Sequence, residues 1–148
     1  MPDILHRISI DADSESVREL VSTKQGVEAW WSAHPVGGTD RLGGQMLIYF
    51  GRSDPSAVME VLEDSPERVL WRCVDGPADW QGTEISFRLD SRDDGGTTLL
   101  FTHAGWREPG EFMANCSTNW GAYLTGLKTG AEGNGFAPYP AGEVSRWS

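Results

Sequence analysis

The chain has 148 residues, 39% hydrophobic and 23% charged, which predicts one globular domain that buries about two-thirds of its unfolded surface. Its 22 acidic residues outnumber its 12 Lys and Arg residues, and a net charge of −10 excludes nucleic acid and anionic membranes as expected partners. We expect a cytoplasmic protein, because no apolar run has membrane-spanning length and the N-terminus lacks a signal-peptide core. Cys73 and Cys116 are too few for a disulfide framework or a zinc knuckle.

The first part of the chain predicts a strand followed by two short helices. Residues 4–10 alternate between apolar and polar side chains, which is typical of a strand. Asp13 or Ser14 can cap the first helix, and Thr23 can cap the second, which carries the Trp30–Trp31 pair. Helices this short are marginal alone, so we expect them to dock on the open end of a curved sheet.

The middle of the chain predicts five further strands, because alternating runs are separated by segments rich in Gly, Pro and Asp. After a loop at residues 34–44, these strands are expected at residues 45–50, 57–63, 68–74, 83–91 and 97–104. Short strands that tight turns join in sequence order form an antiparallel meander.

Residues 109–133 predict one long amphipathic helix, with Pro109 in its first turn and Gly133 at its end. Apolar side chains recur at helical spacing: Met113, Cys116, Trp120, Tyr123, Leu124, Leu127 and Ala131. The strands have no other large element to pack on, so we expect the sheet to wrap this helix and leave a pocket. The domain is then residues 1–133, and residues 134–148 form a tail. Trp147 could clip onto the domain or onto a neighbour, but an ordinary loose end is the favoured interpretation.

The chain resembles the START-like superfamily, also called birch-pollen-allergen-like (SRPBCC) or helix-grip proteins. The motifs that carry the resemblance are WW at Trp30–Trp31, GGQMLIYF, EDSPERVLW, WQGTEISFRL, TTLLFTHAGW and W-x-x-x-L-x-x-L-K from Trp120 to Lys128. Within the superfamily, the chain is most similar to the C-terminal domain of the activator of heat-shock protein 90 ATPase. The resemblance implies an α+β helix-grip fold, in which a curved six-stranded antiparallel sheet holds the C-terminal helix around a mostly apolar cavity.

This layout would place the inward strand residues opposite the long helix, around a cavity suited to a small molecule. The candidate ligand contacts are Trp31, Met46, Ile48, Phe50, Trp71, Ile85, Phe87, Phe101, His103, Phe112, Cys116, Asn119, Trp120 and Tyr123. For each one, a place in the packed core is the more ordinary explanation. Asn119 is the most informative, because an amide on the flank of a buried helix face needs a partner from the protein or from a ligand.

His103 is the best single catalytic candidate, because its ring titrates near neutral pH and occupies an inward strand position. The competing interpretation is a core histidine bonded to the backbone or to Tyr123. His6 and His34 have no ligand-spaced neighbour, so we expect neither a metal site nor a cofactor.

The leading functional hypothesis is non-catalytic binding of a small lipophilic or aromatic molecule, because no acid–base pair, nucleophile triad or metal set is assembled. The first alternative is an enzyme of the polyketide cyclase or dehydratase type, in which His103 and Tyr123 or Asn119 move protons on a bound carbonyl compound. The second alternative is a module that regulates a chaperone ATPase through an acidic face. A chaperone and a second copy of the chain are the protein partners left open.

Overall fold

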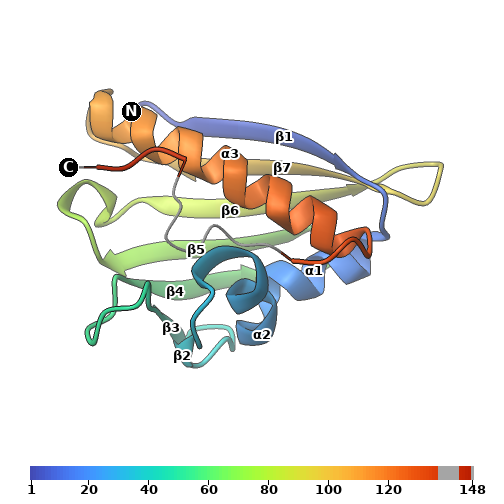
Figure 1. Ribbon diagram of the computed structural model, residues 1–148, viewed down its shortest axis with the longest axis horizontal. Coiled ribbons are helices and arrows are strands. Elements are labelled where there is room, and N and C mark those ends of the chain that lie inside the picture. Colours follow the sequence, from blue (N-terminus) through green and yellow to red (C-terminus); the bar gives the residue numbers. More distant parts are fainter. Residues whose placement is uncertain (137–143, 148) are drawn as a thin grey trace.

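The computed structural model describes residues 1–136 and 144–147, and it shows an α+β fold in which one long helix lies across an antiparallel sheet (Figure 1). The strands are β1 (Ile4–Ile10), β2 (Gly37–Gly38), β3 (Gln45–Ile48), β4 (Ala57–Asp64), β5 (Arg68–Asp75), β6 (Glu84–Ser91) and β7 (Thr97–Ala104). The helical elements are α1 (Ser14–Ser22), α2 (Lys24–Val27), the π-helical turn η1 (Glu28–Ser32), the 3-10 turn η2 (Ala78–Trp80) and α3 (Glu111–Ala131). Neighbouring strands follow the order β1-β7-β6-β5-β4-β3-β2, which confirms the predicted meander and adds β1 beside β7.

The sheet has seven strands, so the predicted number of six is wrong. The extra strand is β2, which lies in the predicted loop at residues 34–44 and pairs with β3. Gly38 has a φ of 73°, and a Cβ at this position would collide with the carbonyl group of Gln45, so the pairing requires glycine. Two consecutive glycines carry no alternation of apolar and polar side chains, and the pattern therefore gave no strand signal. β3 also ends earlier than predicted, which leaves Phe50 in a loop.

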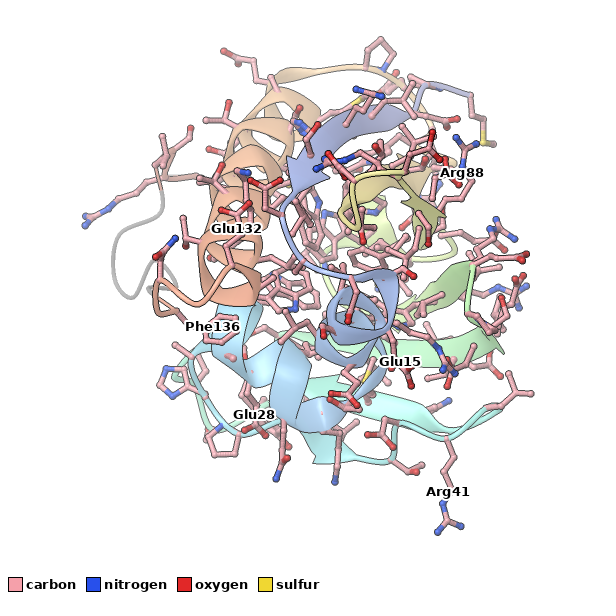
Figure 2. The ribbon with its side chains drawn as sticks, turned by 90° about the vertical axis from the view of Figure 1, so that its right-hand side faces the viewer. Glu15, Glu28, Arg41, Arg88, Glu132 and Phe136 are labelled. Carbon is pink, nitrogen blue, oxygen red and sulfur yellow. The ribbon has the colours of Figure 1, made fainter. Side chains whose placement is uncertain are left out.

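The pairing of β4 with β5 contains two irregularities that curve the sheet. The pairing slips between Val58 and Met59 and again between Val61 and Glu63. Such irregularities increase the local twist and curve a strand. Figure 2 shows the result from the side, with α3 standing along one face of the sheet.

The two short helices form at the predicted positions, and side chains cap both. Asp13 Oδ1 accepts the N–H of Ser16 at 2.8 Å, and Thr23 Oγ1 accepts the N–H of Gly26 at 3.0 Å. α2 then continues into η1, where the wider π turn directs both members of the Trp30–Trp31 pair into the core.

α3 begins two residues later than predicted. Gly110 is its N-cap in an extended conformation, so Pro109 precedes the helix, and the predicted first-turn position of this proline is wrong. Of the predicted apolar stripe, Cys116, Trp120, Tyr123, Leu124 and Leu127 are buried, and Met113 and Ala131 are half-buried. Among the described helices, none has both the length and the apolar character that crossing a membrane requires.

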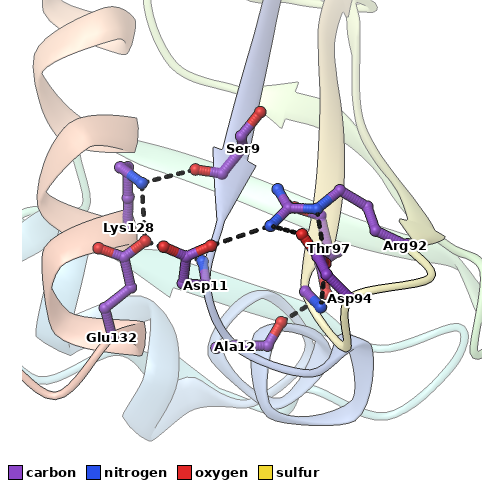
Figure 3. Close-up of polar contacts among 9 residues, drawn as sticks. Ser9, Asp11, Ala12, Arg92, Asp94, Thr97, Lys128 and Glu132 are labelled. Atoms are coloured by element: carbon purple, nitrogen blue, oxygen red, sulfur yellow. Dashed lines mark hydrogen bonds and ion pairs between the residues drawn. The ribbon is translucent and has the colours of Figure 1, made fainter.

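A polar network fastens the C-terminal end of α3 to the sheet (Figure 3). Lys128 Nζ donates to the Ser9 carbonyl group and to the Glu132 carboxylate, both at 2.7 Å. Glu132 also accepts the backbone N–H of Asp11 at 2.8 Å, and Arg92 forms an ion pair with Asp11 at 2.9 Å. Exposed ion pairs contribute little one by one, so the network mainly fixes where the helix end lies relative to β1 and the β6–β7 turn.

Two glycine substitutions should have different effects on stability: one at Gly26, where α2 contacts α1, and one at Gly121 in α3. A Cβ on Gly26 would lie 2.5 Å from the Glu19 carbonyl oxygen and the Leu20 Cα, and both are backbone atoms that cannot move aside. We expect Gly26→Ala to lower the free energy of unfolding by about 1–3 kcal/mol. A Cβ on Gly121, in the middle of α3, would only touch the His6 ring at 3.4 Å. Gly121→Ala should therefore leave the stability unchanged or raise it by up to about 1 kcal/mol.

Urea denaturation of both variants beside the wild type measures these changes. Equal losses of stability in the two variants would contradict the backbone contact between α1 and α2.

Candidate ligand-binding groove

A groove of about 380 Å³ opens at one end of α3. Its walls come from η1, the β3–β4 loop, the β5–β6 connection that contains η2, α3 and the C-terminal segment. The lining residues are Trp31, Phe50, Arg52, Pro77, Trp80, Phe112, Asn115, Cys116, Asn119, Trp120, Tyr123 and Trp147. Seven of these twelve side chains are aromatic rings, so the groove has the composition expected of a small-molecule site.

Half of the fourteen predicted ligand contacts line this groove: Trp31, Phe50, Phe112, Cys116, Asn119, Trp120 and Tyr123. The other seven are Met46, Ile48, Trp71, Ile85, Phe87, Phe101 and His103, and each is at most 1% exposed. These seven side chains pack in the core and do not line the groove. The space predicted beside them is filled by side chains, and the open volume lies nearer the surface.

Trp31 forms the floor of the groove. Its ring centre lies 5.0 Å from that of Trp120 on α3 and 5.7 Å from that of Phe50. Trp71 stacks on it from the core side at 5.9 Å, and Trp80 stacks at 6.4 Å. One ring from η1 therefore joins the sheet, the helix and η2, and its position sets the depth of the groove.

His103 is locked in the core by hydrogen bonds at both ring nitrogens. The indole N–H of Trp120 donates to His103 Nδ1 at 3.2 Å, so Nδ1 carries no proton. Nε2 then carries the proton and donates to Thr83 Oγ1 at 2.8 Å, and the Thr83 hydroxyl donates to the Trp80 carbonyl group. Burial lowers the pKa of His103 to about 3, which keeps the ring neutral. The geometry matches a core histidine, although its partners are Trp120 and Thr83 instead of the expected backbone or Tyr123.

Asn119 holds the C-terminal segment through two hydrogen bonds. Its Nδ2 donates to the carbonyl group of Ser145 at 2.8 Å, and its Oδ1 accepts the N–H of the same residue at 2.9 Å. Trp147 then packs edge-on against Phe112, with ring centres 5.1 Å apart, and becomes part of the groove wall. The prediction of a loose end is therefore wrong for residues 144–147. The partner that the Asn119 amide needed is a backbone group 26 residues further along the chain.

Five lining residues were not predicted: Arg52, Pro77, Trp80, Asn115 and Trp147. Most belong to irregular segments, where no alternation of side chains indicates direction. Trp80 is a large ring between the predicted strands at residues 68–74 and 83–91, and a search for apolar residues in loops could have found it. Arg52 had no such signal, because an arginine in a polar turn is ordinary.

The described residues show neither an activated Cys73 thiol nor a cluster of metal ligands. Burial raises the pKa of Cys73 to about 11, so its thiol is protonated and unreactive at neutral pH. Cys116 is buried on α3 with its side chain at the groove. Within residues 1–136 and 144–147, no group of three or more His, Cys, Asp or Glu side chains is placed to hold a metal ion.

Comparison with known proteins places this geometry in a family context. The family of Activator of Hsp90 ATPase homolog 1-like proteins matches residues 11–132. The solution structure of the Aha1 dimer from Colwellia psychrerythraea is similar, with a TM-score of 0.80 and 32% identity over 90% of this chain and 98% of that chain. No protein of curated function matches.

Two more distant structures share the fold. CalU16 from Micromonospora echinospora has a TM-score of 0.72 and 22% identity, over 89% of this chain and 75% of that one. DynU16, from the dynemicin biosynthetic locus, has a TM-score of 0.71 and 20% identity, over 97% of this chain and 51% of that one. At these identities the likeness extends to the fold alone.

The buried His103 predicts a loss of stability in acid. The folded pKa of about 3 lies below the ordinary value of 6.5, so below pH 6.5 the unfolded chain binds a proton that the folded protein does not. The free energy of unfolding should fall as pH decreases from 6.5 toward 3, with an extra slope of up to about 1.4 kcal/mol per pH unit. Because glutamine does not titrate, His103→Gln should lack this extra slope. Urea denaturation between pH 4 and 8 measures both proteins, and parallel curves would contradict a neutral buried ring.

The Asn119 clamp predicts a local change that leaves the fold intact. Asn119→Ala removes both hydrogen bonds to Ser145, and we expect the Ser145 amide to exchange its hydrogen about tenfold faster or more. Asn115→Ala is the matched control, because Asn115 lies one turn earlier on α3, also lines the groove and makes no described hydrogen bond to the segment. Amide hydrogen exchange followed by NMR reads out the effect. Unchanged exchange in Asn119→Ala would show that the segment is held by other contacts.

Proposed function

The chain belongs to the family of Activator of Hsp90 ATPase homolog 1-like proteins, and from this premise we propose that it binds a small aromatic or lipophilic molecule in the groove beside α3. The single observation that carries the proposal is the wall of the groove, where seven aromatic rings surround about 380 Å³. Pockets for small molecules are concave and mostly apolar, with volumes from about 300 Å³ upward. A flat aromatic guest could pack against the half-buried rings of Phe50 and Phe112 and the exposed ring of Trp147, above the buried Trp31 and Trp120.

The described groove favours binding over catalysis. No Asp, Glu or His side chain is among its described lining residues, so Tyr123 and Asn119 would face a guest without the acid–base partner that the cyclase alternative requires. His103, the residue on which a cyclase mechanism would depend, uses both ring nitrogens within the core. The likeness to CalU16 and DynU16 supplies only a shared fold, so the cyclase alternative receives no support from it.

A homodimer is the second proposal, and it concerns assembly. The observation that favours it is the likeness to the Colwellia protein, which is a dimer and shares 32% identity over nearly its whole length. The only support for a contact with a chaperone is the description of the family.

Filling the groove should weaken binding. In a panel of aromatic and lipophilic compounds, we expect at least one to raise the melting temperature of the wild type by several degrees at saturating concentration, because a ligand that binds only the native state stabilises it. Asn115 is half-buried at the groove, and Asn115→Trp should weaken binding of that compound about tenfold or more.

Thr125→Trp is the control, because Thr125 is an exposed position on the same helix outside the groove. It should bind like the wild type. Equal affinity of Asn115→Trp and the wild type would place the ligand elsewhere, and a panel without any stabilising compound would contradict the proposed function.

A further inference from the structure

The charge on the described wall of the groove is opposite in sign to the net charge of the protein. The protein carries a net charge of −10, yet the described lining residues include one arginine, Arg52, and no carboxylate. Arg52 lies exposed in the β3–β4 loop and forms no ion pair or hydrogen bond with any described residue. Most other arginines described in the sheet region are paired with an acidic neighbour, as Arg72 is with Glu84 and Arg88 with Asp90.

A second group in the same wall also needs an acceptor. Trp80 is 9% exposed, and its indole N–H is buried with no hydrogen-bond partner among the described residues. Buried polar groups in native proteins are almost always paired, so this donor calls for an acceptor, as does the equally unpaired indole N–H of Trp106, which does not line the groove. Both the guanidinium group of Arg52 and the indole N–H of Trp80 can donate hydrogen bonds and cannot accept them.

We infer that the natural guest is an aromatic or lipophilic molecule that carries an acidic oxygen group, such as a carboxylate, which Arg52 binds at the mouth of the groove. This inference rests on the proposed function and specifies its ligand class. The aromatic rings of the groove bind the apolar part, and the carboxylate accepts from the guanidinium group of Arg52. A charge-assisted bond to a guanidinium group is stronger than a neutral one, and no described acidic side chain of the wall repels the anion. A cationic guest would meet Arg52 directly and is disfavoured.

Matched probes test the inference: 2-naphthoate and its neutral methyl ester, titrated by calorimetry at pH 7.5. The wild type should bind the carboxylate about tenfold more tightly than the ester. Arg52→Gln should remove this preference, so that the two probes bind the variant with similar affinity. Arg41→Gln is the control, because it changes the net charge equally at an exposed arginine that points away from the molecule (Figure 2) and outside the groove.

The outcomes separate the inference from the proposed function. A preference for the carboxylate that Arg52→Gln removes and Arg41→Gln keeps supports the inference. Equal binding of the two probes to the wild type, or a preference that survives in Arg52→Gln, overturns the inference and leaves an aromatic site in place. A preference lost equally in both variants assigns it to net charge and overturns the role of Arg52. Failure of both probes to bind contradicts the proposed function as well.

Discussion

The contact between Trp31 and Trp120, with ring centres 5.0 Å apart, is the interaction on which the architecture of the groove depends. It joins the π turn after α2 to the middle of α3, two elements that are far apart in the sequence. The π turn makes this contact feasible, because it buries two consecutive tryptophans: Trp30 packs on Phe87, and Trp31 reaches the helix. Large rings gain both buried area and favourable edge and stacking geometry, so this contact holds α3 at a fixed height above the sheet. The groove is the space that remains above the rings.

Local signals predicted the fold well because each of them reports on one element. Alternation located the strands, Asp13 and Thr23 located the helix starts, and the apolar stripe located α3. Two errors have the same physical origin, which is that glycine and proline carry little directional information. The Gly37–Gly38 pair forms a strand without any alternation, and a proline before the N-cap of α3 has the same sequence signature as one in the first turn.

The candidate site could be predicted only in part. Alternation indicates which face of the sheet a side chain lies on, but it does not indicate whether side chains from other segments cover that position. Trp71 and Phe50 both point toward α3, yet Trp71 is sealed under Trp31 while Phe50 reaches the groove. This difference is decided by which side chains from distant segments cover each position. The pairing of Asn119 with Ser145 is a contact of this kind, between residues with no local pattern in common. His103 illustrates the reverse case, since its inward position was predicted correctly but its role depends on partners that only the folded structure brings together.

The close stacking of indole rings has a spectroscopic consequence. Trp31 lies against Trp30, Trp71, Trp80 and Trp120, so five of the seven tryptophans form one continuous array that ends at the groove floor. Indoles this close exchange excitation energy faster than they emit light. Light absorbed by any member of the array is therefore emitted by the member with the lowest excited state. A molecule bound in contact with Trp31 would quench or shift the fluorescence of the entire array. These five tryptophans should therefore emit as one coupled group whose fluorescence responds to what occupies the groove.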